Sequence, residues 1–220
     1  MSAGTVRALQ IALSALAGYV DAIGFLSLGG FYVAFMSGNS TLLGTGLGTW
    51  NPARLELAAG LVASFVVGVM AGTLIGGRMT RLRPVGVLLL VAGLLAVAAG
   101  LDEAGSLMAA SLVMAVAMGA ENTVFNRPGF SGVGLTYMTG TLVRVGQRVS
   151  EALGGASWGA VVPDLLLWMG MVLGAATGAY AFQHLAVAGL WIGVAATVVM
   201  AAVARWSLPA VVAKPDAVKA

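Results

Sequence analysis

Two acidic residues, Asp21 and Glu121, stand inside long apolar stretches of the sequence. A carboxylate within a membrane span costs roughly 2.5 to 3.5 kcal/mol on insertion scales, so such residues usually face the interior of a helix bundle. We predict that the two carboxylates lie at related depths from opposite membrane faces, where they could couple transport to a proton or a cation. The structural alternative is that each is hydrated at the interface or paired with a residue such as Arg144.

Two polar breaks in apolar segments give the second chemical signal. Residues 31–48 carry Met-Ser-Gly at their centre, and residues 131–150 carry Met-Thr-Gly. The hydroxyl and amide side chains that follow are types that cap helix starts, and a half-helix starting there directs free N–H groups towards an anion or a carbonyl. The predicted substrate-binding residues are Asn39, Ser40, Thr41, Thr139, Thr141 and Arg144.

Arg144 lies one turn into the second broken segment and could offer a fixed positive charge to a carboxylate or a phosphate. Non-helical backbone at membrane depth is tolerated only where protein or a wet cavity satisfies its amides, so two such breaks predict an internal polar site. In the alternative interpretation, both segments are ordinary loops on opposite faces, and Arg144 and Arg148 only anchor the topology.

The composition excludes several classes of protein. The chain has 220 residues, of which 60% are hydrophobic and 9% charged, whereas a soluble domain carries about 25% charged residues. Eleven unclustered basic residues exclude a nucleic-acid interface. With no cysteine and one histidine, the usual metal sites are missing, and no nucleophile elbow or phosphate loop is present. We therefore predict a membrane protein that is not an enzyme and needs no cofactor or metal.

Basic residues select the topology, because they favour the cytoplasmic ends of spans. A six-span arrangement with both termini cytoplasmic places all the basic residues except Arg54 inside. If both broken segments crossed, several arginines would move outside. We therefore predict an all-α polytopic protein of the bacterial inner (plasma) membrane, with two re-entrant segments. The six predicted spans cover residues 7–27, 54–77, 84–101, 105–125, 161–185 and 186–205.

The second half of the chain repeats the first at an offset of about 102 residues. Met36 and Gly38 match Met138 and Gly140, and the acidic helices match at offsets of 100 and 101. Each half has three spans, an odd number, so the halves have opposite orientations in the membrane. The prediction is a 3+3 inverted repeat, typical of many secondary transporters. Its parts are residues 1–101, residues 102–206 and a disordered cytoplasmic tail at 207–220.

Glycines recur every four residues on one face of a helix in each half. Such ridges allow another backbone to approach closely, which is how helices pack where lipid gives no hydrophobic drive. The sequence leaves open whether they pack inside the chain or against a second copy in a homodimer. The predicted helix-packing residues are Gly68, Gly72, Gly76, Gly170, Gly174 and Gly178.

The run GYVDAIGFLSLGGFYVAFMSGNSTLLG, together with GAENTVF and TYMTGTLVRVG in the second half, resembles the YoaK-like bacterial membrane proteins, a domain of unknown function. The resemblance covers most of the chain. It implies a membrane location and the repeat architecture, and it implies no substrate.

Together these features predict a secondary transporter or facilitator of a small polar or anionic solute. The two Met-[Ser/Thr]-Gly segments would form its site, and Asp21 and Glu121 would couple or gate it. Two alternatives remain at this stage. One is a non-transporting membrane scaffold or accessory protein whose glycine ridges bind a partner helix, and the other is a passive channel.

Overall fold

The computed structural model describes residues 1–79, 82–125, 137–185 and 189–208. Within these ranges the chain is helical and contains no strand, as the sequence predicts. The helices are α1 (Ala3–Ser27), α2 (Met36–Gly48), α3 (Pro52–Arg78), α4 (Arg83–Glu103), α5 (Leu107–Glu121), α6 (Met138–Leu153), the short 3-10 helix η1 (Trp158–Ala160), α7 (Val162–Leu185) and α8 (Gly189–Trp206).

Five helices, α1, α3, α4, α7 and α8, are long and apolar enough to cross a membrane. Their bounds agree with five of the predicted spans to within a few residues. The sixth predicted span, 105–125, is a shorter apolar helix, α5, which has 15 residues and ends at Glu121. Fifteen residues extend about 22 Å, less than the roughly 30 Å hydrocarbon layer. Most of α5 is buried by other helices, so little of it needs to face lipid.

The glycine ridge of α7 packs on α1. A methyl group at Gly174 would overlap the carbonyl oxygen of Ala15, and one at Gly170 would come within 3.0 Å of the carbonyl oxygen of Ile11. The contact moves four residues along both helices in the same direction, so α1 and α7 run parallel. Their backbones touch because glycine leaves no side chain between them.

The ridge of α3 packs on α5 in the same way. A methyl group at Gly68 would overlap the carbonyl oxygen of Val116, and one at Gly72 would lie 3.0 Å from the Cα of Ala120. These two helices are therefore also parallel. Both ridges are occupied inside the chain, which answers the question that the sequence leaves open. Neither ridge is free along these positions to receive a second copy or a partner helix.

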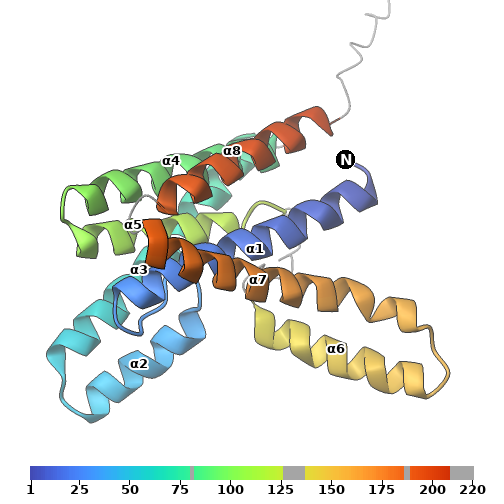
Figure 1. The fold of residues 1–220 in the computed structure, drawn as a ribbon, viewed down its shortest axis with the longest axis horizontal. Coiled ribbons are helices and arrows are strands. Elements are labelled where there is room, and N and C mark those ends of the chain that lie inside the picture. Colours follow the sequence, from blue (N-terminus) through green and yellow to red (C-terminus); the bar gives the residue numbers. More distant parts are fainter. Residues whose placement is uncertain (80–81, 126–136, 186–188, 209–220) are drawn as a thin grey trace, which may run out of the picture.

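The third pairing joins α4 to α8. The indole Nε1 of Trp191, near the start of α8, donates a 2.8 Å hydrogen bond to Glu103, the last residue of α4, so these helices run antiparallel. Each pairing joins a helix from the first half to one from the second, so the halves interleave. In Figure 1, α2 with α3 and α6 with α7 extend to opposite sides of this core.

The first broken segment does not break where the sequence suggests. The helix α2 runs unbroken through residues 37–41, and the non-helical backbone lies before it, at residues 31–35. Ser40 and Thr41 donate hydrogen bonds to carbonyl oxygens four residues earlier, so a helix accommodates them. In the second segment, α6 likewise begins at Met138, while residues 131–136 lie outside the described residues. The predicted tail also lies outside them from residue 209 onwards.

The glycine contacts give a direct stability prediction. Replacing Gly68 with leucine should unfold or strongly destabilise the protein, by at least about 1–3 kcal/mol, because the new side chain would overlap the α5 backbone. Gly77, on the same helix, faces open space, so Gly77→Leu should leave stability nearly unchanged. Melting temperature and size-exclusion profile in detergent measure both effects. Equal losses in the two variants would contradict the packing.

Candidate functional site

The first turns of α2 and α6 meet at one cavity of about 180 Å³. Ser37 comes from the Met-Ser-Gly motif and Thr139 from the Met-Thr-Gly motif, so equivalent positions of the two halves line the same space. Apolar and aromatic side chains form most of the remaining wall. The full lining is Ala34, Phe35, Met36, Ser37, Phe65, Tyr137, Met138 and Thr139.

Neither helix start is capped by a side chain. Phe35 precedes α2 and Tyr137 precedes α6, and neither makes a side-chain hydrogen bond to its first turn. The prediction that the polar residues of the two breaks cap helix starts is therefore wrong. All of them lie inside helices, Asn39, Ser40 and Thr41 in α2 and Thr139 and Thr141 in α6. The leading N–H groups of a helix have no partner within the helix, so these two first turns present backbone donors.

An aromatic ring explains the glycine of each motif. A methyl group at Gly38 would lie 2.6 Å from the ring of Phe35 and 2.8 Å from that of Tyr32. At Gly140 it would overlap the ring of Tyr137. In both halves, the residue that precedes the helix folds its ring over the third helical residue. A side chain at either position would have to displace that ring, so glycine lets the ring lie against the helix.

Asp21 and Asn39 hold the non-helical segment before α2. One carboxylate oxygen of Asp21, which is 6% exposed, accepts hydrogen bonds from the N–H groups of Val33 (2.8 Å) and Ala34 (2.7 Å). The buried Asn39 side chain accepts a 3.0 Å bond from the N–H of Tyr32 and donates to the carbonyl oxygen of the same residue. Polar backbone that would otherwise be orphaned at this depth is satisfied by these two side chains.

Glu121 lies at the end of α5 with no solvent exposure. Within the described residues, neither of its carboxylate oxygens has a hydrogen-bond partner. It therefore differs from Asp21, its counterpart in the repeat, whose carboxylate is held by backbone N–H groups. Burying a carboxyl group without hydrogen-bond partners lowers the stability of the folded protein, so a purely structural role explains it poorly.

Of the predicted binding residues, Thr139 lines the cavity and the others do not. The hydroxyls of Ser40 and Thr41 donate to carbonyl oxygens of their own helix, and the Asn39 side chain bonds to the backbone of Tyr32. Thr141 donates to the carbonyl oxygen of Tyr137 and accepts from Arg144. Arg144 pairs with Asp164, at 3.1 Å, and not with either intramembrane carboxylate. The binding roles of these residues stay predictions.

The sequence predicts that the Met-Ser-Gly segment forms the site, but Ser37 was not among the predicted binding residues. The aromatic residues Phe35, Phe65 and Tyr137 also line the cavity and were not predicted. The signal was present, because the aromatic-Met-[Ser/Thr]-Gly pattern occurs in both halves. Ser14 of α1 was also overlooked. Its hydroxyl donates to the carbonyl oxygen of Leu167 at 2.9 Å and lies 3.9 Å from the sulfur of Met138.

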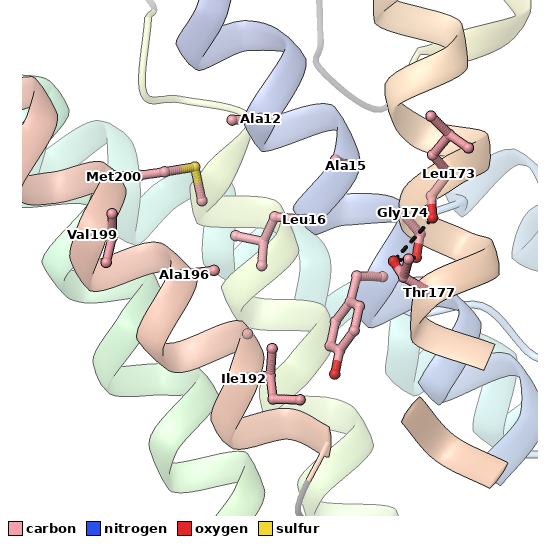
Figure 2. Close-up of a pocket in the computed structure, with 12 residues that line it drawn as sticks. Ala12, Ala15, Leu16, Leu173, Gly174, Thr177, Ile192, Ala196, Val199 and Met200 are labelled. Atoms are coloured by element: carbon pink, nitrogen blue, oxygen red, sulfur yellow. Dashed lines mark hydrogen bonds between the residues drawn. The ribbon is translucent and has the colours of Figure 1, made fainter. Parts of the chain in front are cut away.

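A larger groove of about 520 Å³ lies between α1, α7 and α8, but it is poorly suited to a polar solute (Figure 2). The hydroxyl of Thr177 donates to the carbonyl oxygens of Leu173 and Gly174 in its own helix. The hydroxyl of Tyr19 donates to Gly189 at 2.6 Å. Both polar groups are already satisfied, and the rest of the lining is apolar. Among the residues described, no cluster of three His, Asp or Glu side chains could hold a metal ion.

The helices of spanning length and the buried polar groups define a helical integral membrane protein. A family described as "Protein of unknown function (DUF1275)" matches residues 9–203. The chain is 38% identical over 204 residues to the UPF0700 transmembrane protein RA0705 of Rhizobium meliloti (strain 1021), covering 90% of this chain and 88% of that protein. It is 32% identical over 161 residues to the UPF0700 transmembrane protein YoaK of Bacillus subtilis (strain 168), covering 70% and 72%.

The chain therefore belongs to this family of transmembrane proteins, and the resemblance to YoaK-like proteins is confirmed. No solved structure matches it.

Asp21 gives a prediction about the segment it holds. Asp21→Ala should lower the melting temperature clearly, because two buried N–H groups lose their acceptor at about 1–3 kcal/mol each. Asp21→Asn keeps an acceptor oxygen at the same place, so its melting temperature should fall much less. Glu56→Ala, at an exposed position of α3, is the matched control and should behave as wild type. If Asp21→Asn and Asp21→Ala lower the melting temperature equally, the acceptor oxygen of Asp21 does not account for the stability.

Proposed function

We propose that this protein is a secondary transporter or facilitator of a small anionic or strongly polar solute. The supporting observation is that equivalent helix starts from the two halves of the chain share one cavity. Transporters with discontinuous helices place their sites at such a junction between repeats. The proposal also places the chain in a bacterial inner membrane with both termini cytoplasmic, as the distribution of basic residues predicts.

The electrostatics of the cavity favour negative charge. Helix N-termini carry about half a positive elementary charge, and α2 and α6 each begin at the cavity without a side-chain cap. The hydroxyls of Ser37 and Thr139 add two further donors, one from each half. Phe65 and Ala34 form an apolar part of the same wall, beside these donors.

The volume limits the solute. At about 180 Å³ the cavity is small and favours small solutes. Formate, acetate and nitrate fit this limit, and their planar oxygens suit backbone donors. Acetate adds a methyl group that the aromatic wall can accommodate. These anions are the appropriate first probes.

The helix directions support the proposed six-span inverted repeat. In that topology the first and fifth predicted spans cross in the same direction, as do the second and the fourth. The parallel pairs α1 with α7 and α3 with α5 are consistent with it. The third and sixth predicted spans cross in opposite directions, consistent with the antiparallel pair α4 and α8.

The two halves are not arranged identically, which supports alternating access. The helix α4 packs extensively on α5, whereas its counterpart α8 contacts α1 less and leaves the groove of Figure 2 beside it. If the halves exchanged these arrangements, α8 would close on α1 and α4 would open from α5. Such an exchange is how inverted repeats expose one site to either side.

Glu121 is the better candidate for coupling. It is fully buried and has no hydrogen-bond partner within the described ranges, so a proton or a cation could be exchanged there. Asp21 remains a proposed gating residue, because its bonds to Val33 and Ala34 position the segment that leads into α2.

Flux in proteoliposomes tests the proposal. Purified protein should carry labelled formate, acetate or nitrate faster than protein-free vesicles. Ser37→Leu and Thr139→Leu each place a large side chain in the cavity, so each should abolish most of this flux while leaving the melting temperature nearly unchanged. Ser40→Leu, an exposed position one turn further along α2, should retain it.

Two results would contradict the proposal. One is that none of the three anions moves faster than in empty vesicles, which would favour a scaffold role. The other is that Ser40→Leu reduces flux as much as Ser37→Leu, which would place the pathway elsewhere.

A further inference from the structure

A second cavity, separate from the Met-[Ser/Thr]-Gly site, gathers an unusual amount of positive charge. It measures about 280 Å³ and lies between α1, α6 and α7. Three guanidinium groups line it, against a single carboxylate. The lining comprises Arg7, Gln10, Ile11, Arg144, Arg148, Pro163, Asp164 and Leu167.

Asp164 fixes two of the arginines. One of its carboxylate oxygens lies 3.1 Å from Nε of Arg144, and the other lies 3.1 Å from Nη1 of Arg148. Arg144 also donates through Nη2 to the hydroxyl of Thr141, and Arg148 donates to the carbonyl oxygen of Ala160. Each guanidinium still has N–H donors beyond these bonds, because arginine carries five.

Arg7 has a different position in this cluster. In the described part of the chain it makes no ion pair and no hydrogen bond, although it lines the same cavity from α1. The one carboxylate is shared by the other two arginines. The positive charge of the cavity is therefore largely uncompensated, which is the electrostatic signature of an anion site.

The cavity lies at the ends of two helices of spanning length. Arg7 is in the second turn of α1 and Asp164 is in the first turn of α7, and these helices are parallel. Both ends should therefore reach the same membrane surface, at the depth of the lipid headgroups. Basic pockets between membrane helices at this depth suit phosphate groups.

We propose that the Arg7–Arg144–Arg148 cavity binds a phosphate group. A phosphate carries more charge than a carboxylate and has several oxygens, so it can satisfy guanidinium donors from different helices at once. The source is either the headgroup of an anionic phospholipid or a soluble phosphate compound. Its binding would join α1 to the hairpin of α6 and α7.

Thermal stability of the purified full chain with two probes separates these sources. Nanodiscs containing phosphatidylglycerol should raise the melting temperature above that in phosphatidylcholine, if the source is lipid. Inorganic phosphate in detergent should raise it above chloride at matched ionic strength, if the source is soluble. Either rise in melting temperature supports the phosphate site, provided that the rise is lost or reduced when Arg7 is replaced.

The variant Arg7→Gln tests whether binding depends on Arg7. Loss of one charge-assisted contact should weaken binding of the active probe about tenfold, without breaking any hydrogen bond of the described residues. Arg205→Gln is the matched control, because it removes one charge from an exposed position at the end of α8, on the same predicted face. It should keep the wild-type affinity.

Two outcomes would overturn the proposal. In one, neither phosphatidylglycerol nor inorganic phosphate stabilises the wild-type protein beyond its reference condition. In the other, Arg7→Gln and Arg205→Gln weaken binding equally, which would show only general surface charge.

Discussion

Direct backbone contact between helices is the constraint on which this structure depends. In a bilayer, apolar side chains gain little by leaving lipid, so helices associate through close packing and polar bonds. Here Gly68 on α3 and Gly174 on α7 bring their helices against the backbones of α5 and α1. Each contact joins opposite halves of the chain. The interleaving that follows brings the starts of α2 and α6 to one cavity.

The second constraint is the treatment of polar groups at depth. On the side of the first half, Asp21 and Asn39 satisfy the backbone of the non-helical segment, and the chain can therefore break inside the protein. Glu121 occupies the related place in the second half but has no such bond among the described residues. The two acidic residues at matching sequence positions thus differ in their hydrogen bonds among the described residues. This difference is why Glu121 is proposed for coupling and Asp21 for gating.

Helix positions were predictable because hydropathy over about 20 residues reports directly on burial in lipid. That the two Met-[Ser/Thr]-Gly motifs come together could also be predicted, because they recur at a fixed offset, and both line one cavity. The exact starts of α2 and α6 could not be predicted. Serine and threonine can either cap a helix or donate to the carbonyl oxygens of its preceding turn, and here Ser40 does the latter. The partner of Arg144 could not be predicted either. Asp164 is 20 residues away, and only the α6–α7 hairpin brings the two together.

Ser37 and Thr139 line the same cavity, and cross-linking tests this shared site most directly. The chain contains no cysteine, so Ser37→Cys and Thr139→Cys can be combined without removing any native thiol. A short bifunctional thiol reagent applied to native membranes should link this pair, keeping the two halves together after cleavage between α4 and α5. Ser37→Cys with Leu153→Cys, about 21 Å further along α6 from Thr139, should not be linked. Absence of a link in the first pair, or equal linking in both, would contradict the shared site.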